Sequence, residues 1–270
     1  MIIWLKIKAV LEVFRHFRNP FLVVLLRFGL KKMPFFLYQI NNGGRRVEML
    51  ARPANASMGD LFVLRELFIE ETYRDILPLL EQGPLSVLDV GANLGSFAIW
   101  LNAHRGVSRA FCFEPEPTSF QLCRFNLFNN GVAGAMAMPA AMGGQRRRLS
   151  MQVGRERPGG ISIYNSGAGT SETAEVDVVA FHEWLQRVEG NFDVLKMDCE
   201  GAEWEILDHA PSEVFSRFSI IVAEVHSVTG ASHDVAEFPK LMEKRGFTTV
   251  RWDGHSHGVY IGKRNGGRTR

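Results

Sequence analysis

From residue 85 onward the chain alternates between short apolar segments and amphipathic segments, and this alternation constrains the fold more than any other feature. The apolar segments predict strands at 86–90, 109–113, 135–140, 192–197, 219–225, 246–252 and 257–262. The amphipathic segments predict helices at 94–103, 117–129, 180–188, 201–209 and 234–245. Strands that alternate with helices form a parallel sheet with crossover helices, so we expect a doubly wound α/β fold. A short turn at 253–256 joins the last two strands, which should therefore pair antiparallel.

The first part of the chain follows a different pattern. A basic amphipathic helix is predicted first, and it ends at Asn19-Pro20 because proline breaks a helix. A second, apolar helix is predicted at 21–30, followed by a hairpin within 35–50 and a helix at 60–81. These segments predict a helical and hairpin extension in front of the α/β domain.

Residues 143–175 interrupt the alternation, because they are rich in glycine, serine and arginine. We expect a hairpin at 147–153 and then a mobile loop, since long loops in compact domains are usually functional or disordered. The predicted division of the chain is an N-terminal extension (1–59), a main domain (60–262) and a basic tail (263–270).

The charge is distributed unevenly along the chain. The whole chain carries a net charge of +2, but residues 1–32 hold seven Lys or Arg against one Glu. Residues 263–270 hold four Lys or Arg and no acid, so the body between the two ends carries a net negative charge. An acidic body does not provide the basic groove of a nucleic-acid-binding protein, so no nucleic-acid partner is expected.

The basic first helix is consistent with two roles. Residues 1–32 would make a peripheral contact with the inner membrane surface, or they would form a helical cap packed on the main domain. The apolar run 21–26 ends at Arg27 and is far shorter than the ~20 residues of a membrane span. The three cysteines form no CxxC pair, so a cytoplasmic location without a signal peptide is expected.

The turn after the first predicted strand indicates which ligand the domain binds. The sequence VLDVGANLGSF places Asp89 at the strand end and then Gly91, Asn93 and Gly95 at alternate positions. The dinucleotide fingerprint has glycine where Asn93 stands, and a carboxylate at Asp89 would repel a pyrophosphate. S-adenosylmethionine has no phosphate and carries an ammonium and a sulfonium. The turn therefore favours S-adenosylmethionine, and an NAD-dependent oxidoreductase is the less favoured alternative.

Further polar residues stand at the ends of other predicted strands. Glu114 ends the second strand, where a carboxylate accepts hydrogen bonds from ribose hydroxyls. Asp198 ends a later strand, and Glu224 and His226 end the next one with a spacing of two, which puts them on the same side. Sites in open α/β sheets lie at the carboxyl ends of the strands, so these residues should share one site.

Taken in order, five runs show a resemblance to a known family: VLDVGANLGSF, FEPEPTSFQLCRFNLFNN, PAAMGG, LKMDCEGAEWEIL and AEVHS. The chain resembles the FkbM family of S-adenosylmethionine-dependent methyltransferases over roughly residues 60–262. The resemblance implies a class I methyltransferase fold, Rossmann-like. Its seven-stranded sheet would be mostly parallel, with the last strand antiparallel and helices on both faces. It also implies O-methylation, often of a sugar hydroxyl or a natural-product hydroxyl.

The resemblance also implies roles for single residues. The methionine part of S-adenosylmethionine would be held by Asp89, Gly91, Asn93 and Gly95. Glu114 would take the ribose, Ala141 would lie beside the adenine, and Asp198 would lie near the methyl donor and the acceptor.

A hydroxyl acceptor gains from a nearby base, and four residues are candidates for it. His226 comes first because its ordinary pKa is ~6.5, and Asp198 comes second, with Glu200 and Glu224 as further candidates. Asp198, Glu224 and His226 could instead hold Mg²⁺ or Mn²⁺. A hydrogen-bonded rim without a metal is the favoured interpretation.

The acceptor class follows from the motifs that are present and absent. The favoured acceptor is a hydroxyl of a sugar in a glycan or glycolipid, or of a natural product. The alternatives are a non-sugar small molecule or a protein group, or a module that binds the cofactor without turnover. Amino-methyltransferases of nucleic acids carry a Pro-Pro motif where this chain reads DCEG, and no Pro-Pro occurs in the chain. The sequence does not predict the oligomeric state.

Overall fold

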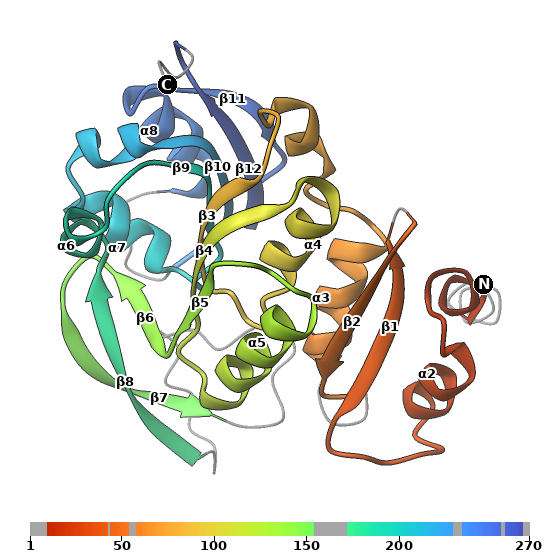
Figure 1. Cartoon of the computed structure of the whole chain (residues 1–270). Helices are drawn as coiled ribbons and strands as arrows, with labels where there is room; N and C mark the ends of the chain where they lie inside the picture. Colours follow the sequence, from red (N-terminus) through yellow and green to blue (C-terminus); the bar gives the residue numbers. More distant parts are fainter. Residues whose placement is uncertain are drawn as a thin grey trace.

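The computed structural model describes residues 10–42, 44–53, 58–153, 172–228, 234–254 and 257–266. Its centre is a seven-stranded sheet with the strand order β11-β12-β10-β9-β3-β4-β5 (Figure 1). The strands are β3 (Leu85–Val90), β4 (Val107–Phe113), β5 (Ala135–Met138), β9 (Phe192–Met197), β10 (Phe218–His226), β11 (Phe247–Trp252) and β12 (His257–Arg264). β12 pairs antiparallel with both β10 and β11, and the other pairs are parallel. The expected mostly parallel sheet with an antiparallel last strand is confirmed.

Helices cover both faces of this sheet, as expected. The elements are α3 (Met58–Phe68), η1 (Arg74–Leu79), α4 (Ser96–Arg105), α5 (Pro117–Asn129), α6 (Phe181–Arg187), α7 (Ala202–His209), η2 (Ser212–Arg217), η3 (Val235–Glu237) and α8 (Phe238–Lys244). Along β3, Val87 packs into a buried cluster with α3, α4 and α5, whereas Leu88 packs into a second cluster with α6, α7 and α8. This alternation follows from the two-residue period of a strand.

Two predicted helices are divided in the structure. The segment predicted as one helix at 60–81 consists of α3 and the 3-10 helix η1, because Glu71 has a positive φ of 49° and Pro78 cannot continue an α-helix. The segment predicted at 234–245 begins with the short 3-10 helix η3, which Asp234 caps, before α8 starts.

The N-terminal extension packs on one face of the main domain. A helix that reaches residue 16 and α2 (Pro20–Arg27) precede the antiparallel hairpin of β1 (Phe36–Asn42) and β2 (Arg45–Ala51). α2 ends at Arg27, before the predicted end at residue 30. Ile40 and Met49 are completely buried in the same cluster as α3 and α4, so the core continues across the predicted boundary at residue 59. No helix in the described part of the chain has the length and apolar character to cross a membrane.

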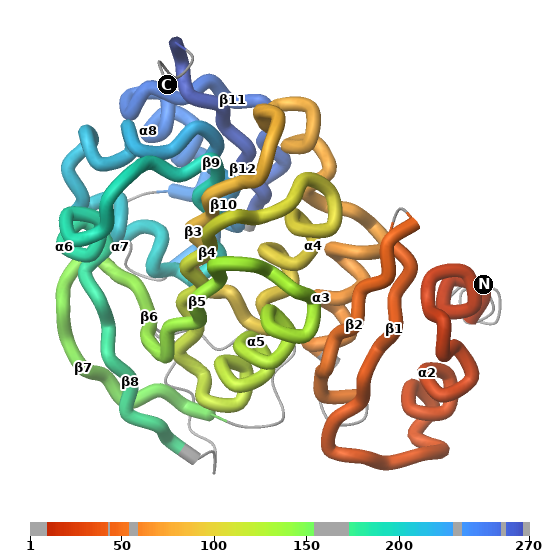
Figure 2. The backbone as a smooth tube through the Cα atoms, in the orientation of Figure 1, coloured from red at the N-terminus to blue at the C-terminus, as the bar shows by residue number. Residues whose placement is uncertain are grey.

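A second, three-stranded sheet stands beside the main sheet, and its order is β6-β8-β7. Its strands are β6 (Ala140–Gly143), β7 (Arg147–Val153) and β8 (Glu172–Ala180), with β8 parallel to β6 and antiparallel to β7. The strand predicted at 135–140 is confirmed for residues 135–138 as β5, and it ends early because the chain leaves the main sheet at Pro139 and enters β6. The strand β8 was not predicted, and the predicted loop after β7 lies outside the described residues. Figure 2 shows this sheet and the N-terminal extension on opposite sides of the molecule.

Candidate active site

The turn between β3 and α4 has a backbone conformation that favours glycine. Gly91 and Gly95 have positive φ angles of 80° and 74°, and Asn93 between them has a φ of 49°. A Cβ atom at position 91 would overlap the carbonyl oxygen of Asp198. Glycine therefore lets the turn lie directly against the end of β9, where the predicted catalytic residues begin.

Asp89 lies beneath this turn and is completely buried. It is paired in register with Lys196 on the neighbouring β9, and the Nζ of Lys196 lies 3.7 Å from its Oδ1. Burial raises the pKa of Asp89 to about 6, and the charge of Lys196 opposes this rise. The carboxylate thus pairs with Lys196, and its role in holding the methionine part of the ligand stays a prediction. Neither carboxylate oxygen accepts a hydrogen bond from a described residue.

Lys196 connects the buried Asp89 to Asp198 at the end of β9. Its Nζ donates to Oδ2 of Asp198 at 3.1 Å and to the carbonyl oxygen of Gly91 at 3.4 Å. Burial alone would lower the pKa of Lys196, but Asp198 and Asp89 outweigh burial and raise it. The buried ammonium therefore stays charged and links the glycine turn to the end of β9. Lys196 is not among the site residues predicted from the sequence, although a lysine within an apolar strand is itself a signal of a buried functional group.

Glu114 lies at the end of β4, next to the glycine turn. Its Oε2 accepts a hydrogen bond from the backbone N–H of Asn93 at 2.8 Å, and its Oε1 accepts one from the N–H of Glu116 at 2.8 Å. Burial raises the pKa of Glu114 to about 7, against the effect of these two hydrogen bonds. A carboxylate has about four lone-pair positions, so each oxygen keeps one for a ribose hydroxyl.

The two remaining residues predicted to bind the cofactor differ in their placement. Gly95 caps α4, and a Cβ there would lie 3.1 Å from the Sγ of Cys123 on α5. Ala141 is buried in β6 of the small sheet, where it pairs with Val178. Gly95 therefore fixes the packing of α4 on α5, and Ala141 lies on the second sheet rather than on the main one.

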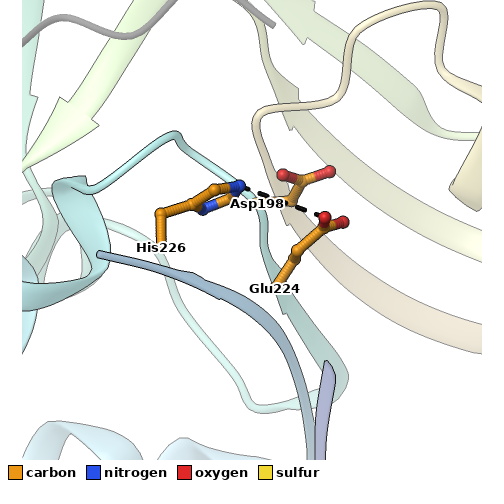
Figure 3. Close-up of side chains that lie close together, drawn as sticks. All are labelled: Asp198, Glu224 and His226. Atoms are coloured by element: carbon orange, nitrogen blue, oxygen red, sulfur yellow. Dashed lines mark ion pairs between the residues drawn. The ribbon is translucent and has the colours of Figure 1, made fainter. Parts of the chain in front are cut away.

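The ends of β9 and β10 bring the predicted catalytic side chains together. Asp198, Glu224 and His226 each offer one ligand atom, and these atoms all lie within 4.8 Å of one another. Figure 3 shows the three side chains pointing toward one another. The Nε2 of His226 lies 4.0 Å from Oε1 of Glu224 and 3.7 Å from Oε2 of Glu200. All four predicted catalytic residues therefore belong to one cluster.

Glu203 organises this cluster and was not predicted as a site residue. It is completely buried, and its carboxylate accepts hydrogen bonds from the N–H groups of Cys199 at 2.7 Å and Gly201 at 2.8 Å. Its Oε1 also lies 3.3 Å from Nδ1 of His226. Glu203 thus fixes both the turn after β9 and the imidazole at the end of β10. An acid in the first turn of a helix that follows a glycine is the sequence signal for such a residue.

The protonation of the cluster follows from its many carboxylates. The repulsion of Asp198, together with burial, raises the pKa of Glu224 to about 8. Burial raises the pKa of Glu200 to about 7. Burial would lower the pKa of His226, but Glu203 and the neighbouring carboxylates outweigh it and raise the pKa to about 10. At neutral pH the imidazole is therefore charged, while Glu224 is largely protonated.

The site as a whole matches the chemistry of S-adenosylmethionine. Glu114 has acceptor positions for ribose hydroxyls, and the carboxylates of the site outnumber its cations. Even Glu66 on α3 has its pKa raised to about 6, by burial and then by the charge of Asp198. An excess of negative charge stabilises the ammonium and sulfonium of the ligand. Glu114, Gly91 and the strand-end acids would hold it.

Fold and site together define a class I methyltransferase that uses S-adenosylmethionine. The antiparallel β12 is inserted between β10 and β11, the glycine turn follows β3, and an acid ends β4. The sequence profile described as Methyltransferase FkbM domain matches residues 89–249, which is more than half of the chain. The chain belongs to the FkbM methyltransferase family.

Individual relatives are similar over most of this chain. The chain is 28% identical to 31-O-demethyl-FK506 methyltransferase FkbM of Streptomyces tacrolimicus, over 76% of this chain and 90% of that protein. It is 26% identical to Methyltransferase 1 of Beauveria bassiana, over 74% of this chain and 85% of that protein. A solved structure of methyltransferase FkbM from Methylobacillus flagellatus is 16% identical, with a TM-score of 0.47, over 68% of this chain and 45% of that one.

Proposed function

We propose that the protein transfers a methyl group from S-adenosylmethionine to a hydroxyl of a natural product or of a sugar in a glycan or glycolipid. The observation that carries this proposal is the cluster of Asp198, Glu224 and His226 at the strand ends beside the glycine turn. An O-demethyl compound is named as the substrate of the relative from Streptomyces tacrolimicus, which supports a hydroxyl acceptor. A non-sugar small molecule and a protein group are the alternative acceptors.

Glu224, assisted by Asp198, is the proposed base. When bound, S-adenosylmethionine supplies a methyl group on a good leaving group, so the protein mainly positions the acceptor and accepts its proton. His226 is the first candidate for the base from the sequence alone, but its pKa of about 10 makes it a cation at neutral pH. The pKa of Glu224 is about 8, so its unprotonated form is a stronger base than an ordinary carboxylate.

The proposed reaction proceeds without a metal. Asp198, Glu224 and His226 lie close enough to bind a divalent cation together. In the absence of an ion, Glu203 and the neighbouring carboxylates hold His226 as a cation, which would have to lose a proton before its Nε2 could bind a metal. The proposed location is the cytoplasm, because Cys112, Cys123 and Cys199 are free.

The test is an assay of the full chain with methyl-labelled S-adenosylmethionine and a panel of sugars and hydroxylated macrolides at several pH values. We expect transfer to a hydroxyl, with a rate that rises as pH approaches about 8. Glu224→Gln should lower kcat by roughly 100-fold or more while S-adenosylhomocysteine still binds. Glu213→Gln, at an exposed site on η2, is the control.

Three outcomes would count against the proposal. Binding of NAD instead of S-adenosylhomocysteine would point to an oxidoreductase. Binding of S-adenosylhomocysteine without transfer to any hydroxyl would point to a different acceptor group or to a module without turnover. A Glu224→Gln protein with normal kcat would move the role of base to Asp198.

A further inference from the structure

The two N-terminal helices expose a group of large apolar side chains. We call the exposed residues Leu11, Phe14, Phe21, Leu22, Leu25, Phe28 and Leu30 the N-terminal apolar face. Their exposed fractions run from 37% to 73%. Single exposed apolar residues are common on protein surfaces, but a contiguous group of this kind marks an interaction site.

Packing on the main domain accounts only for the opposite side of these helices. Val13, Phe17, Val23 and Leu26 are buried, and the ring of Phe17 lies 5.9 Å from that of Tyr38 on β1. A helix that only caps a domain would present polar residues to the solvent. The sequence PFLVVLLR of α2 is apolar on both sides, so its outer side has a separate role.

The exposed residues of the two helices lie on neighbouring surfaces. In α2, Phe21, Leu22 and Leu25 follow the spacing that places residues on one side of a helix, and Phe28 at its C-cap continues this spacing. Leu11 and Phe14 are three residues apart on the preceding helix. The rings of Phe14 and Phe21 contact each other with centroids 5.0 Å apart, so the two helices present their outer sides together.

The charges around the N-terminal apolar face are almost all positive. Arg15, Arg18, Lys31 and Lys32 are exposed beside it. Glu12 is the single acid between residues 10 and 36, and it is paired with Arg65 on α3 at 3.4 Å. These cations favour an anionic partner. They disfavour a second copy of the chain, which would bring the same charges together.

We propose that the N-terminal apolar face docks on an anionic lipid bilayer. Its apolar side chains would enter the boundary between headgroups and acyl chains, and the four cations would contact the headgroups. In Figure 1 these helices lie at the edge of the molecule, beyond the β1–β2 hairpin. The β1–β2 hairpin therefore lies between these helices and the main sheet (Figure 1).

The experiment is flotation of the full chain with phosphatidylcholine vesicles, with and without phosphatidylglycerol, at low and high salt. We expect binding to the anionic vesicles, weaker at high salt. The double variant Lys31→Gln with Lys32→Gln should bind the anionic vesicles about 30-fold more weakly. Each lysine near the membrane surface strengthens the partitioning by about tenfold or less. Phe21→Ala with Leu25→Ala should weaken it by at least about tenfold.

Two control variants match these changes at other surfaces. Lys240→Gln with Lys244→Gln removes two exposed lysines from α8, and Phe128→Ala removes a side chain on α5 that is 87% exposed. Both should partition as the wild type does, and all variants should bind S-adenosylhomocysteine normally. Equal binding of all variants would overturn the proposal. A dimer in sedimentation analysis that Phe21→Ala with Leu25→Ala dissociates, without vesicle binding, would assign the face to a second copy.

Discussion

Gly91→Ala is expected to destabilise the protein and to weaken cofactor binding by moving the glycine turn away from β9. The φ of Gly91 is +80°, where an L-residue costs about 1–2 kcal/mol. In addition, the new Cβ would overlap the carbonyl oxygen of Asp198, so the turn or the strand end must shift. Overpacking of this kind costs roughly 1–3 kcal/mol.

Gly246→Ala separates these two contributions. Gly246 has a φ of +86°, close to that of Gly91, and an added Cβ there would meet no atom of the described residues within 4 Å. Both substitutions also reduce the entropy of the unfolded chain by similar amounts, so this effect cancels in the comparison. The difference between the two variants therefore measures the contact with Asp198, and we expect about 1–3 kcal/mol.

The free energy of unfolding is measured by urea denaturation, and cofactor affinity by calorimetry with S-adenosylhomocysteine. Gly246→Ala should bind normally. Gly91→Ala should bind at least about tenfold more weakly, since the shift also displaces the contact from Lys196 to the carbonyl oxygen of Gly91. Equal unfolding free energies for the two variants, together with normal binding by Gly91→Ala, would refute the reasoning.

Three further predictions concern the charged groups of the site. The pKa of Glu224 is about 8 in the folded protein and 4.5 in the unfolded chain, so the folded state binds more protons and the free energy of unfolding falls as pH rises through this range. When the free energy of unfolding in urea is measured against pH, Glu224→Gln should reduce its downward slope by up to about 1.4 kcal/mol per pH unit. An unchanged slope would contradict this prediction. Asp89→Ala should weaken S-adenosylhomocysteine binding in calorimetry without unfolding the chain, because Lys196 loses one of its two carboxylate partners; normal affinity would exclude this role. Methyl transfer should persist in EDTA, and a loss that Mg²⁺ restores would assign Asp198, Glu224 and His226 as metal ligands.

The strands and helices that the sequence predicted well are those with clear physical signals. Strands β3, β9 and β10 are buried on both faces, so they read as apolar runs that end at a charged residue. The helix α5 has the predicted bounds because Pro117 occupies its first turn and Glu116 caps it. The strand β8 was missed, although Val176, Val178 and Ala180 alternate with exposed or half-buried residues, because the preceding glycine-rich segment suggested a continuing loop.

The site was predicted only as far as topology determines it. Parallel strands place their carboxyl ends on one edge of the sheet. This rule correctly predicts that Asp198, Glu224 and His226 lie close together. It does not say which way a strand-end side chain faces, and Asp89 faces Lys196 because the two are paired across β3 and β9. The contribution of Glu203 depends on three simultaneous contacts, which no spacing in the sequence encodes.

The hairpin also has a consequence for the order in which the chain is made. The N–H of Leu50 on β2 donates to the side chain of Asn126 on α5, which follows 76 residues later. At 5–20 residues per second, a ribosome needs roughly 4 to 15 s to reach that asparagine. During this interval the hairpin lacks its hydrogen bonds to Asn126, and a hairpin without such support is at best marginally stable. A substitution of Asn126 should therefore first reduce the yield of folded protein from synthesis, before any change in methyl transfer by the molecules that fold.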